Sequence, residues 1–223
     1  MKTLLFSDTH LLATFYEGKY KFLKKIIQNS DRVVIVGDFW EGKLISFDDF
    51  VNSDWNKLFP LLKQKHTVYV YGNHDKEKYC DKRVKLFSDK QTTKYSLKQG
   101  DMLFKVKHGN TKQIKYVFIK RLTKITRMSQ RFYYNHLHEG LEHILVEAFG
   151  PKILQVLFKR YNSTLKKTEK PLLSDNEYLV CGHTHAAELD LKNHFINTGI
   201  IRHGIGQYVV INGNKIELHD ERY

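Results

Sequence analysis

The first third of the chain alternates short, wholly apolar segments with amphipathic ones, and this alternation constrains the fold more than any other feature. The segments 2–6, 32–36 and 67–71 are apolar on both faces and predict buried strands. The segments 19–28 and 54–64 carry apolar residues at helical spacing and predict helices between those strands. Buried strands separated by helices are typical of an α/β sheet that helices cover.

Beyond residue 84 the predicted strands are shorter and more polar. They lie at 94–97, 103–107, 178–181, 187–190, 194–196, 207–211 and 215–219. The sequence Asn212-Gly213-Asn214 predicts a tight hairpin between the last two. This half of the chain predicts an antiparallel or mixed second sheet that packs against the first.

The segment 112–167 changes to helical spacing. A first run of apolar residues contains Phe118, Leu122, Ile125 and Phe132. After a break at Gly150-Pro151, a second helical run contains Leu154, Leu157, Phe158 and Tyr161. We interpret residues 1–223 as a single domain with a helical insertion, or cap, at about 112–170.

Five polar groups follow the apolar runs, where predicted strands give way to loops. They are Asp8-Thr9-His10, Gly37-Asp38, Gly72-Asn73-His74-Asp75, His108-Gly109 and Gly182-His183-Thr184-His185. Loops at the carboxyl ends of strands are where ligands collect in α/β proteins. Carboxylate, carboxamide and imidazole groups suit divalent metals of borderline hardness, and two such metals clamp a phosphoryl group. The sequence therefore predicts a dinuclear phosphoesterase.

Each group taken alone has a plainer explanation. Gly37-Asp38 is an ordinary turn, and Asn73 or Asp75 would be a helix cap. The other histidines, such as His136, lack comparable spacing and are expected to be solvated or packed in the core. The order of the five groups, each at a strand end and all with the same ligand chemistry, favours the metal centre.

In this order the groups resemble the calcineurin-like metallophosphoesterase family, whose D-x-H, G-D, G-N-H-D/E, H-G and G-H-x-H motifs here span Asp8 to His185. The resemblance implies an α/β fold, a metallophosphoesterase β-sandwich of two mixed sheets flanked by helices, here with a helical insertion. It also implies two divalent ions, with Mn²⁺ expected and Fe or Zn²⁺ acceptable to the same ligands.

The resemblance further implies a role for each ligand. The residues expected to hold one metal are Asp8, His10 and His185, and those expected to hold the other are Asn73, His108 and His183. Asp38 would bridge the two metals. A hydroxide that also bridges them would attack phosphorus in line while the metals neutralise the phosphate oxygens.

The resemblance assigns His74 to catalysis rather than to metal binding: it would stabilise the transition state or protonate the departing alkoxide. Related phosphatases carry G-D-x-x-D-R-G, and here Glu41 stands in the place of the second acid, where it would orient His74. Asp75 is a rival partner, although an N-cap role is the expected one. The arginine of that longer motif is absent, which disfavours the protein-Ser/Thr-phosphatase branch.

The net charge of +13 favours an anionic partner, and residues 111–175 alone carry 13 basic against 5 acidic side chains. The predicted insertion has a basic stripe of Lys120, Lys124, Arg127 and Arg131, which we take as candidate substrate-binding residues. The alternative is a merely solvated helix face. The basic face would also suit an anionic membrane surface or a nucleic-acid backbone.

The leading hypothesis is a phosphoesterase or pyrophosphatase that acts on a small phosphorylated molecule. The layout resembles the enzymes that cleave UDP-2,3-diacylglucosamine, a nucleotide-sugar lipid, but those commonly have Arg at the position of His74. One alternative is a nuclease or nucleotide phosphodiesterase, although no aromatic platform for base stacking is obvious. The other is a non-catalytic scaffold, which the complete ligand set and His74 disfavour.

Three further expectations concern membrane spans, cellular location and residues 197–203. No apolar run approaches the roughly 20 residues of a transmembrane span. Two cysteines, Cys80 and Cys181, favour a reducing, cytoplasmic setting, with peripheral membrane contact left open. Asn197-Thr198-Gly199 resembles a structural turn of the family, and Arg202 and His203 could approach the substrate phosphate.

Overall fold

The first layer of the fold is a sheet whose central strands are buried on both faces. The computed structural model describes residues 1–110, 139–150 and 152–223, and the bounds below refer to these. The parallel strands of this sheet are β1 (Lys2–Phe6), β2 (Arg32–Ile35), β3 (Val68–Val70) and β4 (Lys90–Thr92). On the other side of β1 lie the antiparallel strands β11 (Ile205–Asn212), β10 (Ile201–Arg202) and β12 (Lys215–Arg222).

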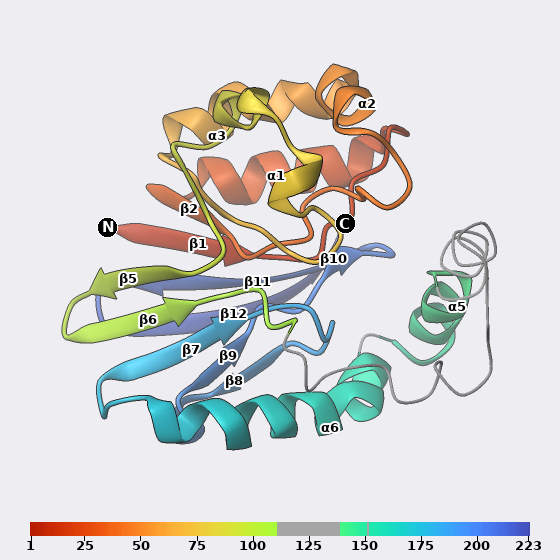
Figure 1. Cartoon of the computed structure of the whole chain (residues 1–223). Helices are drawn as coiled ribbons and strands as arrows, with labels where there is room; N and C mark the ends of the chain where they lie inside the picture. The colour runs from red at the N-terminus through yellow and green to blue at the C-terminus, as the bar shows by residue number, and fades with distance from the viewer. Residues whose placement is uncertain (111–138, 151) are drawn as a thin grey trace.

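Helices cover the outer face of this sheet (Figure 1). They are α1 (Glu17–Gln28), α2 (Phe47–Asn52), α3 (Phe59–Gln64) and the short 3-10 helices Asp54–Leu58, Glu77–Tyr79 and Lys82–Leu86. Phe22 and Leu23 of α1 and Phe50 of α2 are buried against the sheet. Burying one such side chain contributes about 1.5–3 kcal/mol, so the apolar face of each amphipathic segment fixes which side meets the sheet.

The second sheet packs its inner face on the first. Its strands, in order, are β5 (Tyr95–Gln99), β6 (Met102–Val106), β7 (Glu177–Cys181), β9 (Phe195–Asn197) and β8 (Glu188–Asp190). The pairs β6–β7 and β7–β9 are parallel, whereas β5–β6 and β8–β9 are antiparallel. Leu5 and Val34 from the first sheet meet Phe104 and Val180 from the second in one buried cluster. The expected pair of mixed sheets flanked by helices is confirmed.

The predicted insertion is helical where the structure describes it. It contains α5 (Glu139–Phe149) and α6 (Lys152–Glu169). A 3-10 turn at Lys170–Leu172 follows α6, and another, outside the insertion, follows β8 at Leu191–Asn193. Helix α6 lies along the outer face of the second sheet, where Leu165 packs with Leu179 and Phe195 (Figure 1). The first predicted run, with Phe118 and its neighbours, lies outside the described residues. No described helix is both long and apolar enough to cross a membrane.

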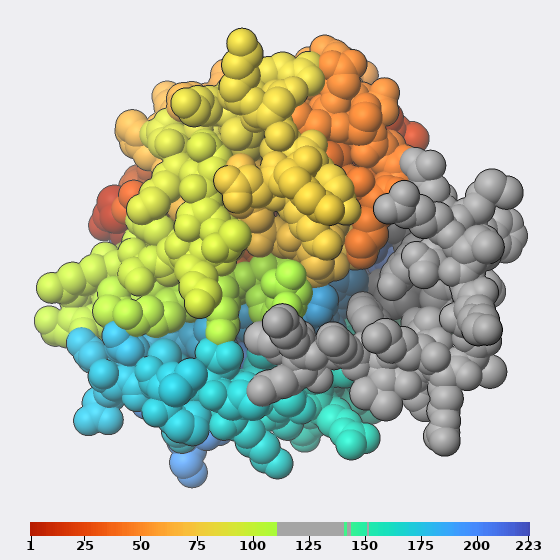
Figure 2. Space-filling model, viewed as in Figure 1, coloured from red at the N-terminus to blue at the C-terminus, as the bar shows by residue number. Residues whose placement is uncertain are grey.

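One grouping of strands predicted from the sequence is wrong. The strands expected at 207–211 and 215–219 do not join the second sheet: β11 pairs with β1, and β12 pairs with β11. All residues of β11 except Asn212 are buried, which suits a central strand between two layers. The hairpin itself is as expected, with Asn212 paired to Lys215 and Gly213 at a φ of 58°. Figure 2 shows the two halves, orange to yellow-green and cyan, packed together.

Candidate metal centre

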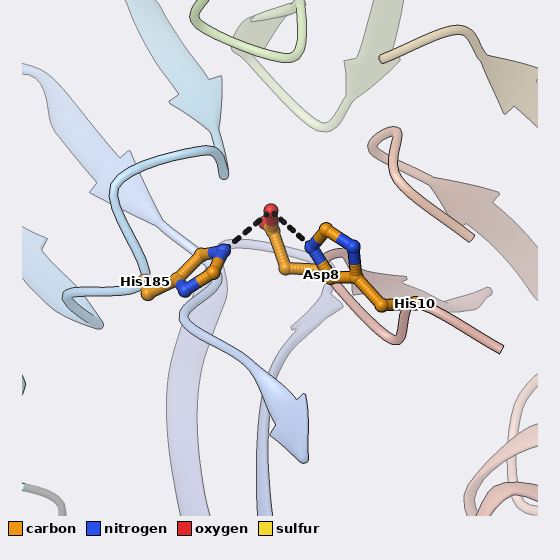
Figure 3. A group of neighbouring side chains, drawn as sticks. All are labelled: Asp8, His10 and His185. Carbon is orange, nitrogen blue, oxygen red and sulfur yellow. Dashed lines mark ion pairs between the residues drawn. The ribbon is translucent and has the colours of Figure 1, made fainter. Parts of the chain in front are cut away.

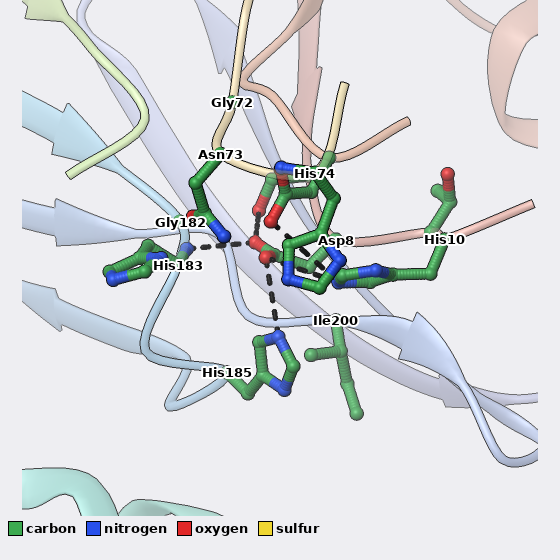
Figure 4. A network of polar contacts seen from close by, with 12 residues as sticks. Asp8, His10, Gly72, Asn73, His74, Gly182, His183, His185 and Ile200 are labelled. Carbon is green, nitrogen blue, oxygen red and sulfur yellow. Dashed lines mark hydrogen bonds and ion pairs between the residues drawn. The ribbon is translucent and has the colours of Figure 1, made fainter. Parts of the chain in front are cut away.

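The polar groups predicted from the sequence converge at one edge of the two sheets. Each lies two or three residues beyond a strand: Asp8 after β1, Asp38 after β2, Asn73 after β3, His108 after β6 and His183 after β7. Because parallel strands present their carboxyl ends at the same edge, five loops from two sheets meet there. Figure 4 shows Asn73 and His183 at one end of the group and His10 at the other, with Asp8 between them.

The first cluster consists of Asp8, His10 and His185 (Figure 3). Nε2 of His185 lies 3.3 Å from Oδ1 of Asp8, and Nε2 of His10 lies 3.8 Å from the same oxygen. All three ligand atoms lie within 4.8 Å of one another. The side chains of Asp8 and His10 are almost wholly buried, whereas 12% of His185 is exposed. One face of this cluster therefore remains within reach of solvent.

The second cluster consists of Asp38, His108 and His183, again with ligand atoms within 4.8 Å of one another. Oδ2 of Asp38 lies 3.1 Å from Nε2 of His108. Oδ1 of Asn73 lies 3.0 Å from the same nitrogen, so Asn73 belongs to this end of the centre. Nδ1 of His108 lies 2.9 Å from the carbonyl oxygen of Val36. That contact directs Nε2 of His108 toward the cluster.

Asp38 connects the two clusters. The oxygen Oδ2 that faces His108 also lies 3.8 Å from Nε2 of His10. Oδ1 of the same carboxylate accepts a hydrogen bond of 2.8 Å from the backbone N–H of His74. One oxygen is therefore held by the backbone, and the other lies between the two groups of imidazoles.

Most of the converging side chains are attached to an unusual backbone. Five of these residues have a left-handed backbone, with φ between 45° and 67°: Asp8, His10, Asp38, His183 and His185. Such conformations cost of order 1–3 kcal/mol each and persist only where the surroundings impose them. Here the loops bind one another: the N–H of Asp8 donates to Gly37 O and the N–H of His10 donates to Asp38 O.

Two glycines let these loops approach closely. A Cβ on Gly72 would lie 2.1 Å from Oδ1 of Asp38, and a Cβ on Gly182 would lie 2.1 Å from Oγ of Ser7. Neither contact is possible for a real side chain, because the atoms would overlap. The glycines of the G-N-H-D and G-H-x-H motifs are thus needed for packing at the centre.

The charges of the centre depend on one another. Burial alone would raise the pKa of Asp8 and of Asp38. Instead, His10 and His185 hold the pKa of Asp8 well below its usual range, and His108 does the same for Asp38. Burial lowers the pKa of His108, but Asp38 outweighs it and raises that pKa to about 9. Burial, assisted by the charge of His108, lowers the pKa of His183 to about 3. Without another cation, positive charge on imidazole balances the carboxylates.

The donor set fits divalent metal ions. Oδ1 of Asp8 and Nε2 of His10 are buried and have no hydrogen-bond partner within the described part of the chain. A buried polar atom without a partner costs about 1–3 kcal/mol, and a metal ion would satisfy both atoms. Oxygen and imidazole nitrogen are also the donors that borderline divalent metals accept, and Asp38 extends the same donor set to the second cluster.

Glu41 and His74 are brought together as the sequence predicts. Nδ1 of His74 lies 2.6 Å from a Glu41 oxygen, and the carboxylate is 98% buried. The structure adds two contacts that the motifs do not indicate. Oε2 of Glu41 also lies 2.7 Å from Nδ1 of His10, and Nζ of Lys43 lies 2.6 Å from Nε2 of His74. Glu41 therefore supports a metal-cluster histidine and the candidate catalytic histidine at once.

Asp75 is neither the partner of His74 nor a helix cap. Its buried carboxylate accepts hydrogen bonds from the backbone N–H groups of Phe39 and Gly72 and from the hydroxyl of Tyr69. Burial raises its pKa to about 6. The N-cap interpretation is wrong because Lys76, not Asp75, occupies the N-cap position of the following 3-10 helix. Asp75 instead ties the loop after β2 to the loop after β3.

Sequence reasoning missed a second support for the His183–His185 loop. Asn162 of α6 is 2% exposed, and its Nδ2 donates to the carbonyl oxygen of Ala186 at 2.9 Å. Its Oδ1 accepts from the hydroxyl of Thr184 at 2.7 Å. Asn197, in the turn predicted as structural, donates to the same hydroxyl at 2.8 Å. An asparagine within an amphipathic pattern gives no signal in the sequence for such a contact.

The remaining candidate substrate-binding residues fall into two groups, one outside and one inside the described part of the chain. Lys120, Lys124, Arg127 and Arg131 lie outside the described residues. Arg202 and His203 lie in and just after β10, and both line a cavity that His10 also lines. That cavity is near the first cluster, where a substrate phosphate was expected.

Solved structures with a similar fold include phosphoesterases. An archaeal phosphodiesterase shares 18% identity, with all of both chains covered and a TM-score of 0.55. Vps29 from Entamoeba histolytica, solved with Zn²⁺, shares 14% identity over 100% of this chain and 98% of that one, with a TM-score of 0.49. The phosphoesterase Yfce from E. coli shares 15% identity over 97% and 91%, with a TM-score of 0.48. At 18% identity the likeness to the archaeal phosphodiesterase concerns the fold alone.

Sequence comparison is more specific. No curated protein sequence matches the chain. The family model for the calcineurin-like phosphoesterases, however, matches residues 1–187, a range that contains all five polar groups. With its two mixed sheets and its candidate metal-binding groups, this chain belongs to the calcineurin-like phosphoesterase family.

Proposed function

We propose that this protein is a phosphoester hydrolase that uses two divalent metal ions, with phosphodiesters and pyrophosphates of small molecules as its substrate class. The observation that carries the proposal is the position of Asp38, whose Oδ2 lies 3.8 Å from His10 and 3.1 Å from His108. A carboxylate placed between two sets of ligands suits a pair of ions better than a single ion.

In this proposal Asp8, His10 and His185 hold one ion, and Asn73, His108 and His183 hold the other. Asp38 is shared. When bound, two such ions polarise the phosphoryl oxygens and make water nucleophilic at neutral pH. Mn²⁺ is the metal we would supply first, although Fe and Zn²⁺ accept the same ligands.

The remaining residues act on the substrate. Glu41 holds Nδ1 of His74 at 2.6 Å. In this proposal Nε2 of His74, which lies beside Nζ of Lys43, acts on the phosphoryl group or the departing oxygen. The side chain of His74 is 15% exposed, which leaves it accessible to a substrate. We propose that His74 stabilises the charge that develops there and that Lys43 assists it.

The proposal extends to organisation and setting. We treat the chain as one domain whose helical insertion, α5 and α6 included, lies beside the centre. Its two cysteines form no disulfide with one another, and one of them, Cys181, is buried, which suits the reducing setting of a cytoplasmic enzyme.

The test is hydrolysis of bis-p-nitrophenyl phosphate and p-nitrophenyl phosphate by protein stripped with EDTA and re-supplied with Mn²⁺. We expect Mn²⁺ to restore turnover of the diester, and His74→Ala to lower kcat at least 100-fold, because a positioned acid or base contributes about 10²–10⁴. His66→Ala is the matched control, since the His66 side chain is 77% exposed and pairs with Asp89 at the surface. Metal-loaded protein that hydrolyses neither ester would overturn the proposal and favour a non-catalytic role.

A further inference from the structure

A cavity of about 510 Å³ lies beside the second ligand cluster. We call it the Lys76 cavity. Gly72, which lines it, directly precedes Asn73 (Figure 4), and Asn110, which also lines it, follows His108 by two residues. Because consecutive Cα atoms are about 3.8 Å apart, parts of the lining lie within about 8 Å of the backbone of that cluster. The volume falls within the range of about 300–1,000 Å³ that small-molecule sites occupy.

The lining of this cavity carries polar groups that are available to a ligand. They are the hydroxyl groups of Tyr71 and Thr93, the ammonium groups of Lys76 and Lys78 and the amide of Asn110. In the part of the chain that the structure describes, none of these side chains makes a hydrogen bond or an ion pair. Ammonium groups only donate, and hydroxyl and amide groups can donate as well, so the lining offers more donors than acceptors.

The cavity also brings positive charge close to the candidate catalytic histidine. Its described lining holds the ammonium groups of Lys76 and Lys78, both exposed, and the carboxylate of Glu77. Burial lowers the pKa of Lys43, and the charge of Lys76 acts in the same direction. Nζ of Lys43 lies 2.6 Å from Nε2 of His74. The field of Lys76 therefore extends to the place where Lys43 and His74 are proposed to meet the phosphoryl group.

Tyr71 gives the cavity one fixed wall. The residue is 9% exposed, and its ring packs against that of Tyr69 with centroids 4.9 Å apart. Its backbone N–H donates to the carbonyl oxygen of Thr92 at 2.8 Å, which also holds the neighbouring Thr93 in place. Burial raises the pKa of Tyr71 to about 12, so its hydroxyl stays protonated at neutral pH. The cavity thus has a fixed tyrosine wall in addition to its two lysines.

An anion rich in hydrogen-bond acceptors suits these groups best. A divalent cation would meet two ammonium groups and a single carboxylate among the described lining residues. An apolar group would displace water from the ammonium groups without replacing its hydrogen bonds. Lysine binds phosphate as a point charge, and hydroxyl groups add hydrogen bonds to its oxygens. Resting on the proposed function, we propose that the Lys76 cavity binds a second phosphoryl group of the substrate, next to the one that the metal centre hydrolyses.

Two kinds of substrate present a second phosphoryl group near the first. In a pyrophosphate the two groups are joined directly, whereas in a nucleotide chain a sugar separates them. Thymidine 5′-monophosphate carries one phosphate, thymidine 5′-diphosphate carries two that are joined directly, and thymidine 3′,5′-bisphosphate carries two that the sugar separates. Because all three ligands share the same nucleoside, their affinities report the second phosphate and its position.

The test is calorimetry of these three ligands on the full chain loaded with Mn²⁺, without excess free metal. We expect at least one of the two-phosphate ligands to bind at least fivefold tighter than the monophosphate, because charge-assisted hydrogen bonds form to the second phosphate. A greater advantage for the diphosphate would indicate a pyrophosphate substrate, and a greater advantage for the bisphosphate would indicate a nucleotide chain. No advantage for either ligand would overturn the proposal.

Two double variants assign the advantage to this cavity. Lys76→Ala combined with Lys78→Ala removes both ammonium groups, and we expect the advantage to fall to about twofold or less. Lys82→Ala combined with Lys85→Ala is the matched control, because it removes the same charge from exposed lysines that do not line the cavity. An equal loss in both double variants would indicate a long-range effect of net charge and would overturn the proposal, as would an advantage that the first double variant retains.

The same ligands separate this proposal from the phosphoesterase proposal. Each ligand should inhibit hydrolysis of bis-p-nitrophenyl phosphate by the Mn²⁺-loaded protein in the order of its affinity. If the ester is not hydrolysed, the phosphoesterase proposal fails, but a calorimetric advantage that depends on Lys76 and Lys78 still supports the cavity. If the ester is hydrolysed and no such advantage exists, the phosphoesterase function stands and the proposal for the cavity is rejected.

Discussion

The ligand loops and helix α6 both contact the second sheet, but they are held in different ways. The loops are held by backbone hydrogen bonds and buried carboxylates, and several of their residues have a left-handed φ. Helix α6 is held by one buried face, while Val156 on another face is 71% exposed. The contrast indicates that the geometry of the centre is imposed by the two sheets. From the described insertion, Asn162 hydrogen-bonds the loop that carries His183 and His185.

The largest effect should follow a change within the loops. In Glu41→Gln we expect kcat for bis-p-nitrophenyl phosphate to fall about 100-fold or more, because the amide cannot hold Nδ1 of His74 as a carboxylate does. Metal affinity should also fall about 10-fold to 100-fold through the lost support of His10. Steady-state kinetics at saturating Mn²⁺ separate the two effects. Glu217→Gln, at a half-buried surface position in β12, is the control, and equal kcat in both variants would contradict the assigned role.

A smaller effect should follow a change in α6 at its contact with the loops. Asn162→Ala removes the hydrogen bonds to Thr184 and Ala186, so we expect Mn²⁺ affinity to fall about tenfold, as for other residues that orient ligands. Lys167→Ala, on the exposed side of the same helix, should leave it unchanged. Metal titration followed by calorimetry measures the difference. If both variants bind Mn²⁺ as the wild type does, the loop needs no support from the insertion.

The anchoring of α6 to β8 should depend on pH. Nζ of Lys166 lies 2.8 Å from Asp190, and Lys166→Met should lower the free energy of unfolding by about 0.5–1 kcal/mol at pH 7. Burial would raise the pKa of Asp190, but the hydrogen bonds from Lys166 and Asn193 outweigh it, so that the pKa lies below its usual value. A carboxyl group whose pKa is lowered in the folded state stabilises the fold at pH values above its unfolded pKa of about 4. This contribution is lost as the pH falls through the folded-state pKa.

Urea unfolding of Lys166→Met and of wild type at pH 7 and at about pH 3 provides the check. The difference between the two proteins should be smaller at the lower pH than at the higher one, because part of the contribution is lost as the pH falls below the unfolded pKa. A difference that persists unchanged at about pH 3 would mean that the lysine stabilises the helix through packing, for instance on the ring of Phe195, rather than through its ion pairs.

The smallest effect should come from the exposed face of the same helix. Val156→Ser replaces a largely exposed side chain and should change the free energy of unfolding by no more than about 0.5 kcal/mol. Urea unfolding at pH 7 measures this. A loss above about 1 kcal/mol would show that this face is covered in the folded protein, and the contrast between the two regions would then be weaker than we describe.

Much of the fold follows from local sequence patterns. Strands 2–6 and 32–36 were predictable because residues such as Leu4, Leu5 and Val34 must be buried on both faces. The partner of β11 was not predictable, since pairing with β1 joins segments about 200 residues apart and no local pattern records it. Helix α2 was also missed: six residues are too short for a periodic signal, although Ser46 and Asp49 form a capping box.

The candidate site divides in the same way. Asp8, Asp38 and His108 could be named because ordered motifs at strand ends carry the ligand chemistry, and the structure brings these residues together. The supports could not be named. Lys43 and Asn162 become important only through contacts across the fold, at 2.6 Å to His74 and 2.7 Å to Thr184. Side chains that act through tertiary contacts leave no spacing in the sequence.

The central claim is that Asp38 joins two metal positions in one centre. Electron paramagnetic resonance of the Mn²⁺-loaded protein, with the bound metal counted in the same sample, tests this most directly. We predict two Mn²⁺ per chain with an exchange-coupled spectrum, and loss of the coupling in Asp38→Ala but not in exposed Asp54→Asn. One Mn²⁺ per chain, or two that give only uncoupled signals in the wild type, would contradict the account.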